Sequence, residues 1–149
     1  MGYMLDLRKY VGKKCLIQVA ASIIIINSEG EILLGKRADN GMWGYAGGSM
    51  EIDEKPEECA KRELYEEMGL IANEITLFMI NAGKETHYTY PNGDEVSNVE
   101  IIYLCNNYQG EIKTIDRELT ELKFFKIDNL PEISPPIRPV FVKLKEYLK

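Results

Sequence analysis

The chain has 149 residues, which is the size of one domain. Hydrophobic residues make up 45% and charged residues 28% of the chain, and this ordinary globular composition excludes the disordered, collagen-like and low-complexity classes. The net charge of −6 argues against binding to nucleic acid through its phosphates, because such binding needs a basic face. We therefore expect no nucleic-acid partner.

The cysteines and the apolar stretches indicate the compartment. Cys15, Cys59 and Cys105 are odd in number, far apart and form no CxxC pair, which favours a reduced intracellular protein with small buried cysteines and no zinc site. The first residues lack the apolar segment of a signal peptide. The longest apolar stretch, residues 16–26, is too short to span a bilayer. We predict a cytoplasmic protein without a membrane partner.

The first third of the chain predicts a short helical turn, two strands and a loop. The turn of helix falls around residues 5–10. Residues 16–27 are nearly continuous in apolar residues and rich in Val and Ile, which is typical of a strand buried on both faces. A turn at 28–31 leads to a second strand at 32–36. Residues 39–55 are rich in glycine and acidic residues and predict a functional loop rather than a simple connection.

The clearest predicted helix covers residues 56–68. Pro56 suits the first helical position, and Gly69 suits the left-handed position that follows a helix. Apolar residues recur at every fourth position, which predicts one buried stripe, made of Ala60, Leu64 and Met68.

The rest of the chain predicts strands and a final helix. Strands are expected at 73–81, 85–91, 96–107 and 121–127, with Asn92-Gly93 as a two-residue hairpin turn. A helix begins near Pro139 and carries Val140, Leu144 and Leu148 on one face. Strands mixed with helices indicate an α/β or α+β fold in which helices cover a mixed sheet.

The negative charge is concentrated in residues 51–67, which hold seven Glu and one Asp against three basic residues. Glu63, Glu66 and Glu67 share an arc of about 100° on the predicted helix, although like charges at this spacing destabilise a helix. Such clustered carboxylates suit Mg²⁺, which binds to oxygen ligands. The alternative is an ordinary solvated face, favoured by i, i+4 pairs of opposite charge.

Residues 48–70 read GSMEIDEKPEECAKRELYEEMGL. This segment resembles the signature box of the Nudix hydrolases at each of its defined positions, Gly48, Glu54, Arg62, Glu63, Leu64, Glu66, Glu67, Gly69 and Leu70. The ILLGKR, WGYAGG and DRELTELKFF runs also look like family members, so the resemblance covers roughly residues 16–130. Two positions depart from the family pattern, with Ala46 where many members have Pro and Asp53 where many have Gly.

The resemblance implies a single Nudix domain over residues 1–149, an αβα sandwich with a mixed sheet between helices. It implies hydrolysis of a nucleoside diphosphate linked to another moiety, with ADP-ribose, a dinucleoside polyphosphate or a (d)NTP as the small nucleotide substrate. Relatives are often homodimers, so a homodimer is a further expectation.

The resemblance also implies the site. Mg²⁺ or Mn²⁺ is expected on Glu63, Glu66, Glu67 and the carbonyl of Gly47, with Glu118 as a further candidate ligand. Arg62 is expected to position Glu63, and which glutamate acts as the general base stays open. The expected loop-forming residues are Gly48, Glu54 and Gly69.

Three residues outside the box are candidates for substrate binding. Arg37 and Trp43 could contact a phosphate or a base, or could be a surface arginine and a packing anchor. Tyr88 could line a nucleotide pocket or pack across strands. His87, the only histidine, is expected to be solvated.

An alternative to the enzyme is a non-catalytic Nudix-like module that senses a nucleotide or binds a partner. A degenerate module would be expected to lose box glutamates, and none is lost here. The sequence therefore favours the enzyme.

Overall fold

The computed structural model describes residues 2–149. The helices are α1 (Tyr3–Val11), α2 (Pro56–Met68), the short 3₁₀ helix η1 (Pro135–Ile137) and α3 (Arg138–Tyr147). The strands are β1 (Leu16–Ile25), β2 (Ile32–Arg37), β3 (Trp43–Gly44), β4 (Ala46–Ser49), β5 (Leu70–Thr89), β6 (Glu95–Gly110) and β7 (Leu119–Phe125).

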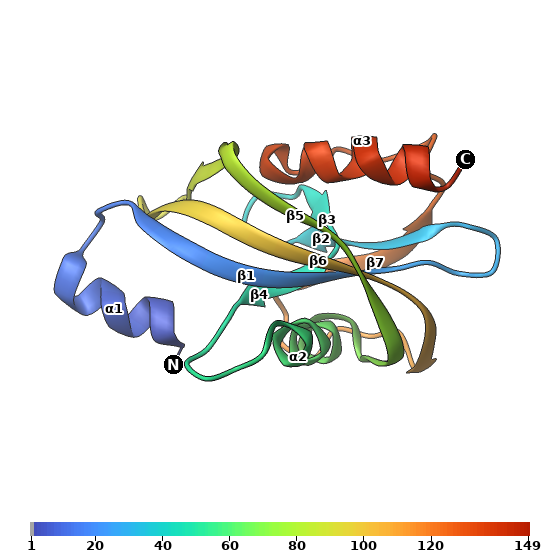
Figure 1. Cartoon of the computed structure of the whole chain (residues 1–149), viewed down its shortest axis with the longest axis horizontal. Helices are drawn as coiled ribbons and strands as arrows, with labels where there is room; N and C mark the ends of the chain where they lie inside the picture. The colour runs from blue at the N-terminus through green and yellow to red at the C-terminus, as the bar shows by residue number, and fades with distance from the viewer. Residues whose placement is uncertain (1) are drawn as a thin grey trace.

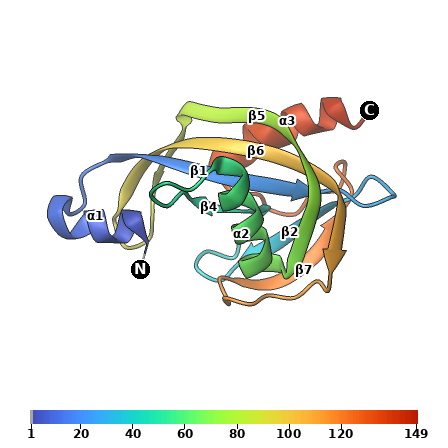
Figure 2. The same cartoon turned by 60° about the horizontal axis from the view of Figure 1, so that its bottom comes forward.

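The strands form two sheets, whereas the sequence predicted a single mixed sheet. The larger sheet has the order β4-β1-β6-β5 and is mixed, because β1 and β6 run parallel while the other pairs are antiparallel. The smaller sheet, β3-β2-β7, is antiparallel. Figures 1 and 2 show α2 on one side of the sheets and α3 on the other. The predicted fold class, sheets flanked by helices, is confirmed.

Strand β1 contributes to the core on both of its faces, as its continuous apolar sequence predicted. Ala21, Ile23 and Ile25 pack in the cluster that contains the buried stripe of α2. Ile24 packs in the second cluster, with Val140 and Leu144 of α3. Because side chains alternate along a strand, one strand joins both helix layers.

Helix α2 has the predicted bounds and the predicted ends. Pro56 is its first residue, and Gly69 caps it in the left-handed conformation with φ 75°. The stripe of Ala60, Leu64 and Met68 is completely buried. This packing fixes the rotation of the helix, and therefore fixes which of its glutamates face β4.

Three predicted elements differ in the structure. The two strands expected at 73–81 and 85–91 form one strand, β5, whose pairing with β6 is irregular between Ala82 and His87, around Gly83 at φ 107°. Glycine adopts this φ without strain, so the chain kinks without leaving the sheet. The segment 39–55 contains the short strands β3 and β4.

The turn between β5 and β6 also differs. Tyr90 donates its N–H to the carbonyl of Asp94, which leaves a three-residue loop rather than the expected two-residue turn. Pro91 favours the first central position of a type I turn, since its ring fixes φ near −65°. Gly93 then takes the positive φ of 93° that closes such a loop.

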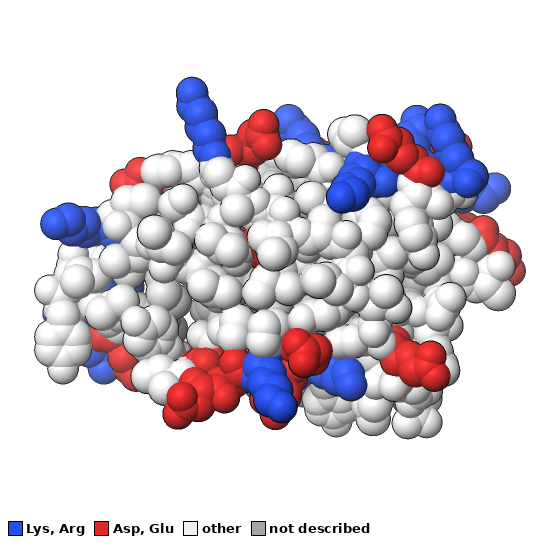
Figure 3. All heavy atoms as spheres, viewed as in Figure 1, with Lys and Arg blue, Asp and Glu red and all other residues white. Residues whose placement is uncertain are grey.

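The charges are unevenly placed on the surface. In Figure 3, acidic side chains gather along the lower edge, where α2 lies in Figure 1, while much of the face in view is uncharged. Within residues 2–149, no helix is both long enough and apolar enough to cross a membrane.

Candidate active site

Two glycines of β4 make room for the carboxylates of α2. The N–H of Gly47 donates to Oε1 of Glu67 at 2.8 Å. A Cβ atom at Gly48 would lie 2.5 Å from the carboxylate of Glu63, and one at Gly47 would lie 2.1 Å from Oγ of Ser22. A side chain at Gly47 would collide with Ser22 and with the backbone of β1, so this position requires glycine. A side chain at Gly48 would displace the carboxylate of Glu63.

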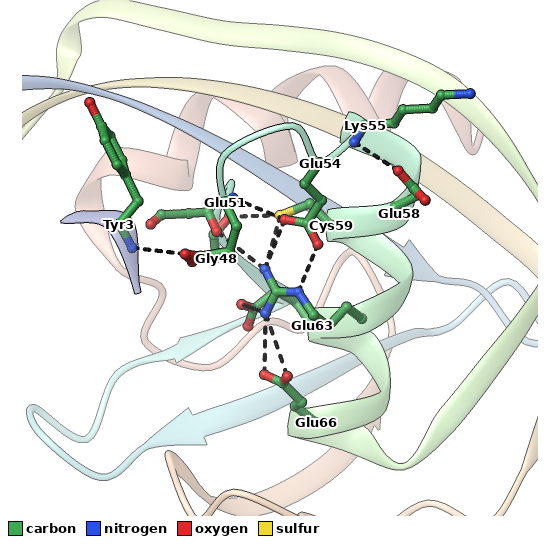
Figure 4. Close-up of polar contacts among 11 residues, drawn as sticks. Tyr3, Gly48, Glu51, Glu54, Lys55, Glu58, Cys59, Glu63 and Glu66 are labelled. Carbon is green, nitrogen blue, oxygen red and sulfur yellow. Dashed lines mark hydrogen bonds and ion pairs between the residues drawn. The ribbon is translucent and has the colours of Figure 1, made fainter. Parts of the chain in front are cut away.

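Arg62 is the centre of the ion-pair network on α2. Its guanidinium binds the Glu54 carboxylate through Nε at 2.8 Å and Nη2 at 3.0 Å. Nη1 donates to Oε1 of Glu63 at 2.9 Å and lies 3.5 Å from the carboxylate of Glu66. Figure 4 shows these three carboxylates around the guanidinium. Arg62 thus connects the loop before α2 to two of the predicted metal ligands.

The loop before α2 is held at several points. The N–H of Glu51 donates to Oε1 of Glu54 at 3.0 Å, and Asp53 lies in the left-handed region with φ 65°. The carboxylate of Glu51 in turn accepts the N–H of Tyr3 at the start of α1, at 2.8 Å (Figure 4). Asp tolerates positive φ better than most residues, which explains how it replaces the more usual glycine here.

Burial dominates the electrostatics of these carboxylates. It raises the pKa of Glu63 to about 7, although the charge of Arg62 opposes the shift. It also raises the pKa of Glu67, against the hydrogen bond from Gly47. The pKa of Glu54 is lowered, chiefly by its hydrogen bonds to Arg62. Buried carboxylates that face one another favour a bound cation, because a cation relieves both their desolvation and their repulsion.

Glu118 joins the same site from a distant segment. The N–H groups of Ile115 and Asp116 donate to the carbonyl of Glu66 at 3.1 and 3.0 Å, which holds this segment against α2. Burial and the charge of Asp116 raise the pKa of Glu118. Glu63, Glu66 and Glu118 line one cavity of about 790 Å³, which we call the acidic cavity. Its oxygen-only donor set fits Mg²⁺ or Mn²⁺.

A second, smaller cavity of about 160 Å³ adjoins the acidic cavity. We call it the β1–β6 pocket, because Ser22 of β1 and Glu100 of β6 lie on its wall. The Glu100 carboxylate accepts hydrogen bonds from Oγ of Ser22 at 2.7 Å and from Oη of Tyr45 at 3.0 Å. Burial raises its pKa. The two cavities share several wall residues, Gln18, Arg37, Gly47, Gly48, Tyr90 and Leu119.

The three predicted substrate contacts lie in different surroundings. Arg37 is on the wall shared by both cavities and forms a two-pronged ion pair with Asp39, at 2.9 and 2.7 Å. Tyr88 lines the β1–β6 pocket, edge-on to Tyr90. Trp43 lines neither cavity and packs edge-on against Phe125, with 5.0 Å between ring centroids. This geometry favours the packing interpretation of Trp43.

Sequence reasoning missed most of the β1–β6 pocket. Glu100 and Ser22 belong to no motif, and Tyr45, although part of the WGYAGG run, was not singled out. The three residues lie on separate strands or loops, so spacing does not connect them. Ser134 also lines the pocket, and its buried Oγ has no hydrogen-bond partner within residues 2–149. The one available signal was a glutamate in the otherwise apolar run of β6, VEIIYLC, because a charged residue in such a strand needs polar partners.

Comparisons with known proteins identify relatives of this chain. The NAD-capped RNA hydrolase NudC of Vibrio cholerae is 30% identical over 115 residues, covering 76% of this chain, and the chain spans only 39% of that relative. The ADP-ribose pyrophosphatase of Methanocaldococcus jannaschii is 33% identical over 133 residues, covering 87% of this chain and 73% of the relative.

A solved structure and a family model extend the similarity to the fold. The crystal structure of a MutT NUDIX hydrolase from Burkholderia pseudomallei aligns with a TM-score of 0.70 and 26% identity, covering 87% of this chain and 96% of that one. The model of the NUDIX domain matches residues 16–144. The chain therefore belongs to the Nudix hydrolase family.

Proposed function

We propose that this protein is a divalent-metal-dependent hydrolase of the pyrophosphate linkage in a small nucleotide. The proposal rests on two cavities that share part of their walls. One is lined by carboxylates, and the other is lined by aromatic and polar groups. The acidic cavity suits a metal-bound pyrophosphate, and the β1–β6 pocket suits a nucleoside. Family membership supports the reaction class, and the relatives act on different substrates, as their names state.

The proposed metal ligands are Glu63, Glu66, Glu67, the carbonyl of Gly47 and Glu118. Mg²⁺ or Mn²⁺ bound there supplies an activated water and neutralises charge on the phosphoryl oxygens. The fit rests on the donor set, since these groups offer only oxygens. The Glu67 side chain is buried, and the Glu63 carboxylate lies directly against Gly48. A site built this way favours a hard cation over a soft one.

Side chains around the acidic cavity would hold the reacting groups in position. Arg62 fixes the rotamer of Glu63 through the 2.9 Å hydrogen bond, so one carboxylate oxygen is held while the other stays available to a ligand or a proton. A carboxylate within reach of the attacking water can act as its general base, and Glu63, Glu67 and Glu118 are the candidates. Arg37, on the shared wall, would reach a substrate phosphate after releasing part of its pair with Asp39.

The β1–β6 pocket favours a base that presents N–H donors. A carboxylate has about four acceptor sites, and within residues 2–149 three donors reach Glu100, the weakest being Nδ2 of Asn81 at 3.5 Å. An acceptor site therefore remains for a ligand. Tyr88 and Tyr90 supply aromatic rings on which a base can stack, and such stacking does not depend on which base is present.

The test is metal-dependent product release from a panel of substrates. The panel contains ADP-ribose, diadenosine polyphosphates, nucleotide sugars, (d)NTPs and oxidised dNTPs, each with and without Mg²⁺ and Mn²⁺, with Glu63→Gln as the control enzyme. Turnover that requires the metal and disappears in Glu63→Gln supports the proposal. Ligand-induced thermal stabilisation without turnover of any substrate would instead favour the non-catalytic sensor.

A further inference from the structure

Three side chains with different metal-binding atoms meet at the edge of the larger sheet, away from the carboxylates of α2. Cys15 directly precedes β1, Glu95 begins β6 and His87 lies on β5. The thiol sulfur, a carboxylate oxygen and an imidazole nitrogen all lie within 4.8 Å of one another. Nε2 of His87 already contacts Oε2 of Glu95.

The strand pairing explains why residues so far apart in the sequence meet. Strands β1 and β6 pair in parallel with Leu16 opposite Val96, which places Cys15 beside Glu95. Strands β5 and β6 pair with Thr89 opposite Glu95 and continue with His87 two residues away. The backbone hydrogen bonds between three adjacent strands therefore bring Cys15, His87 and Glu95 together.

We propose that Cys15, His87 and Glu95 bind a divalent transition-metal ion of the zinc class, with water as the fourth ligand. A set of one thiolate, one imidazole and one carboxylate suits Zn²⁺ and is a poor match for Mg²⁺, which prefers oxygen alone. The site is therefore chemically distinct from the acidic cavity. Its ligands include the only histidine of the chain and the one exposed cysteine.

The geometry is compatible with tetrahedral coordination after small side-chain movements. Bonds of about 2.0–2.3 Å at tetrahedral angles place ligand atoms about 3.4–3.6 Å apart. The three ligand atoms lie up to 4.8 Å apart. Rotation of the side chains can bring them closer, because Cys15 and His87 are exposed and Glu95 is half-buried. The backbone of Glu95 is itself held, because its carbonyl accepts Nη2 of Arg8 at 2.6 Å.

A metal at this position would stabilise the attachment of α1. Helix α1 ends at Val11, four residues before Cys15, and its residues Met4, Leu5 and Arg8 line the acidic cavity. Coordination would join the chain that follows α1 to β5 and β6. We therefore expect zinc-class ions to raise the thermal stability of the protein without being required for hydrolysis.

The experiment is a Co²⁺ titration of the reduced, metal-free full chain, with saturating Mg²⁺ present to occupy the acidic cavity. Co²⁺ bound to a thiolate gives a charge-transfer absorption that oxygen ligands do not give. We expect one equivalent of Co²⁺ to produce this band and one equivalent of Zn²⁺ to remove it. The melting temperature, measured in parallel, should rise with either ion.

Variants identify the ligands. Cys15→Ser should abolish the band, and His87→Ala and Glu95→Gln should each weaken Co²⁺ binding at least tenfold. Glu85→Gln, an exposed carboxylate on the same strand as His87, is the matched control and should leave binding unchanged. The proposal is overturned if the wild-type protein shows no thiolate band, if the band survives Cys15→Ser, or if His87→Ala binds Co²⁺ normally.

Discussion

The backbone N–H of Gly47 donates to the buried carboxylate of Glu67 at 2.8 Å. This bond joins the strand that supplies a proposed carbonyl ligand to the helix that supplies the proposed carboxylate ligands. When Glu67 is ionised, the bond is charge-assisted, and such bonds are the stronger kind. The relative position of β4 and α2 is thereby set before any metal binds.

Glu67→Gln separates this structural role from the proposed metal role. The amide oxygen of Gln can still accept the N–H of Gly47, but the buried negative charge is lost. We expect turnover to fall roughly 100-fold or more, and the melting temperature of the metal-free protein to rise, because repulsion with Glu63 and Glu118 is relieved. The Mg²⁺-induced rise in melting temperature should shrink.

Activity assays and thermal melts with and without EDTA check this prediction. Glu146→Gln, an exposed carboxylate on α3, serves as the matched control. Normal turnover by Glu67→Gln would contradict the metal assignment. A metal-free variant that melts below the metal-free wild type would contradict the repulsion argument.

The stability of the metal-free protein should decrease as the pH rises from about 4.5 to about 7. The pKa of Glu63 in the folded state is about 7 against 4.5 as its ordinary value, so the folded protein binds more protons than the unfolded chain in this window. The free energy of unfolding therefore falls with rising pH, by roughly 3 kcal/mol for Glu63 alone. Glu67 and Glu118, whose pKa values are also raised, act in the same direction.

Urea unfolding in EDTA at about pH 5 and about pH 7.5 measures this difference. Glu63→Gln should reduce it, since the variant has no group to titrate at that position. Equal stability of the wild-type protein at the two pH values would refute the argument.

Arg62→Lys should impair activity while keeping the charge. Lysine cannot reproduce the two-pronged contact with Glu54 or bind Glu63 at the same time. We expect a loss of roughly 10- to 100-fold, mainly in kcat or in the Mg²⁺ concentration needed for half-maximal activity. Steady-state kinetics at several Mg²⁺ concentrations provide the measurement. Unchanged kinetics would show that Arg62 does not position Glu63.

Glu100→Gln should change which nucleotide is preferred. The substitution keeps the shape of the β1–β6 pocket but replaces one acceptor oxygen by a donor. We expect kcat/KM for the preferred nucleotide to fall roughly 10- to 100-fold, with the Mg²⁺ dependence unaltered. The same substrate panel checks this, with Glu85→Gln as the control. An unchanged order of substrates would show that Glu100 does not contact the base.

The sequence predicted those parts of the fold whose signals are local. Helix α2 has its predicted bounds because its cap, its buried stripe and its proline lie within 14 consecutive residues. Asp53 stands where many members of the family have Gly, and it adopts the left-handed conformation that glycine favours. The network around Arg62 was also accessible, since Glu54, Glu63 and Glu66 are near neighbours in the chain.

Features made by distant strands could not be predicted in the same way. The division into two sheets depends on which strand edges pair. The alternation of polar and apolar residues within one strand does not indicate its pairing partner. Glu100 and Ser22 are 78 positions apart, and Cys15 meets His87 through two sheet pairings. The exposed position of Cys15 also corrects the expectation that all three cysteines are buried.

The bond from Tyr3 to Glu51 has a practical consequence for work with this protein. Gly2 and the first turn of α1 line the acidic cavity, so an affinity tag fused ahead of them would emerge beside that cavity. A tag rich in histidine there would bring extra metal ligands close to the proposed metal ligands. The C-terminus lies at the opposite end of the molecule in Figure 1, and it is the better place for a fusion.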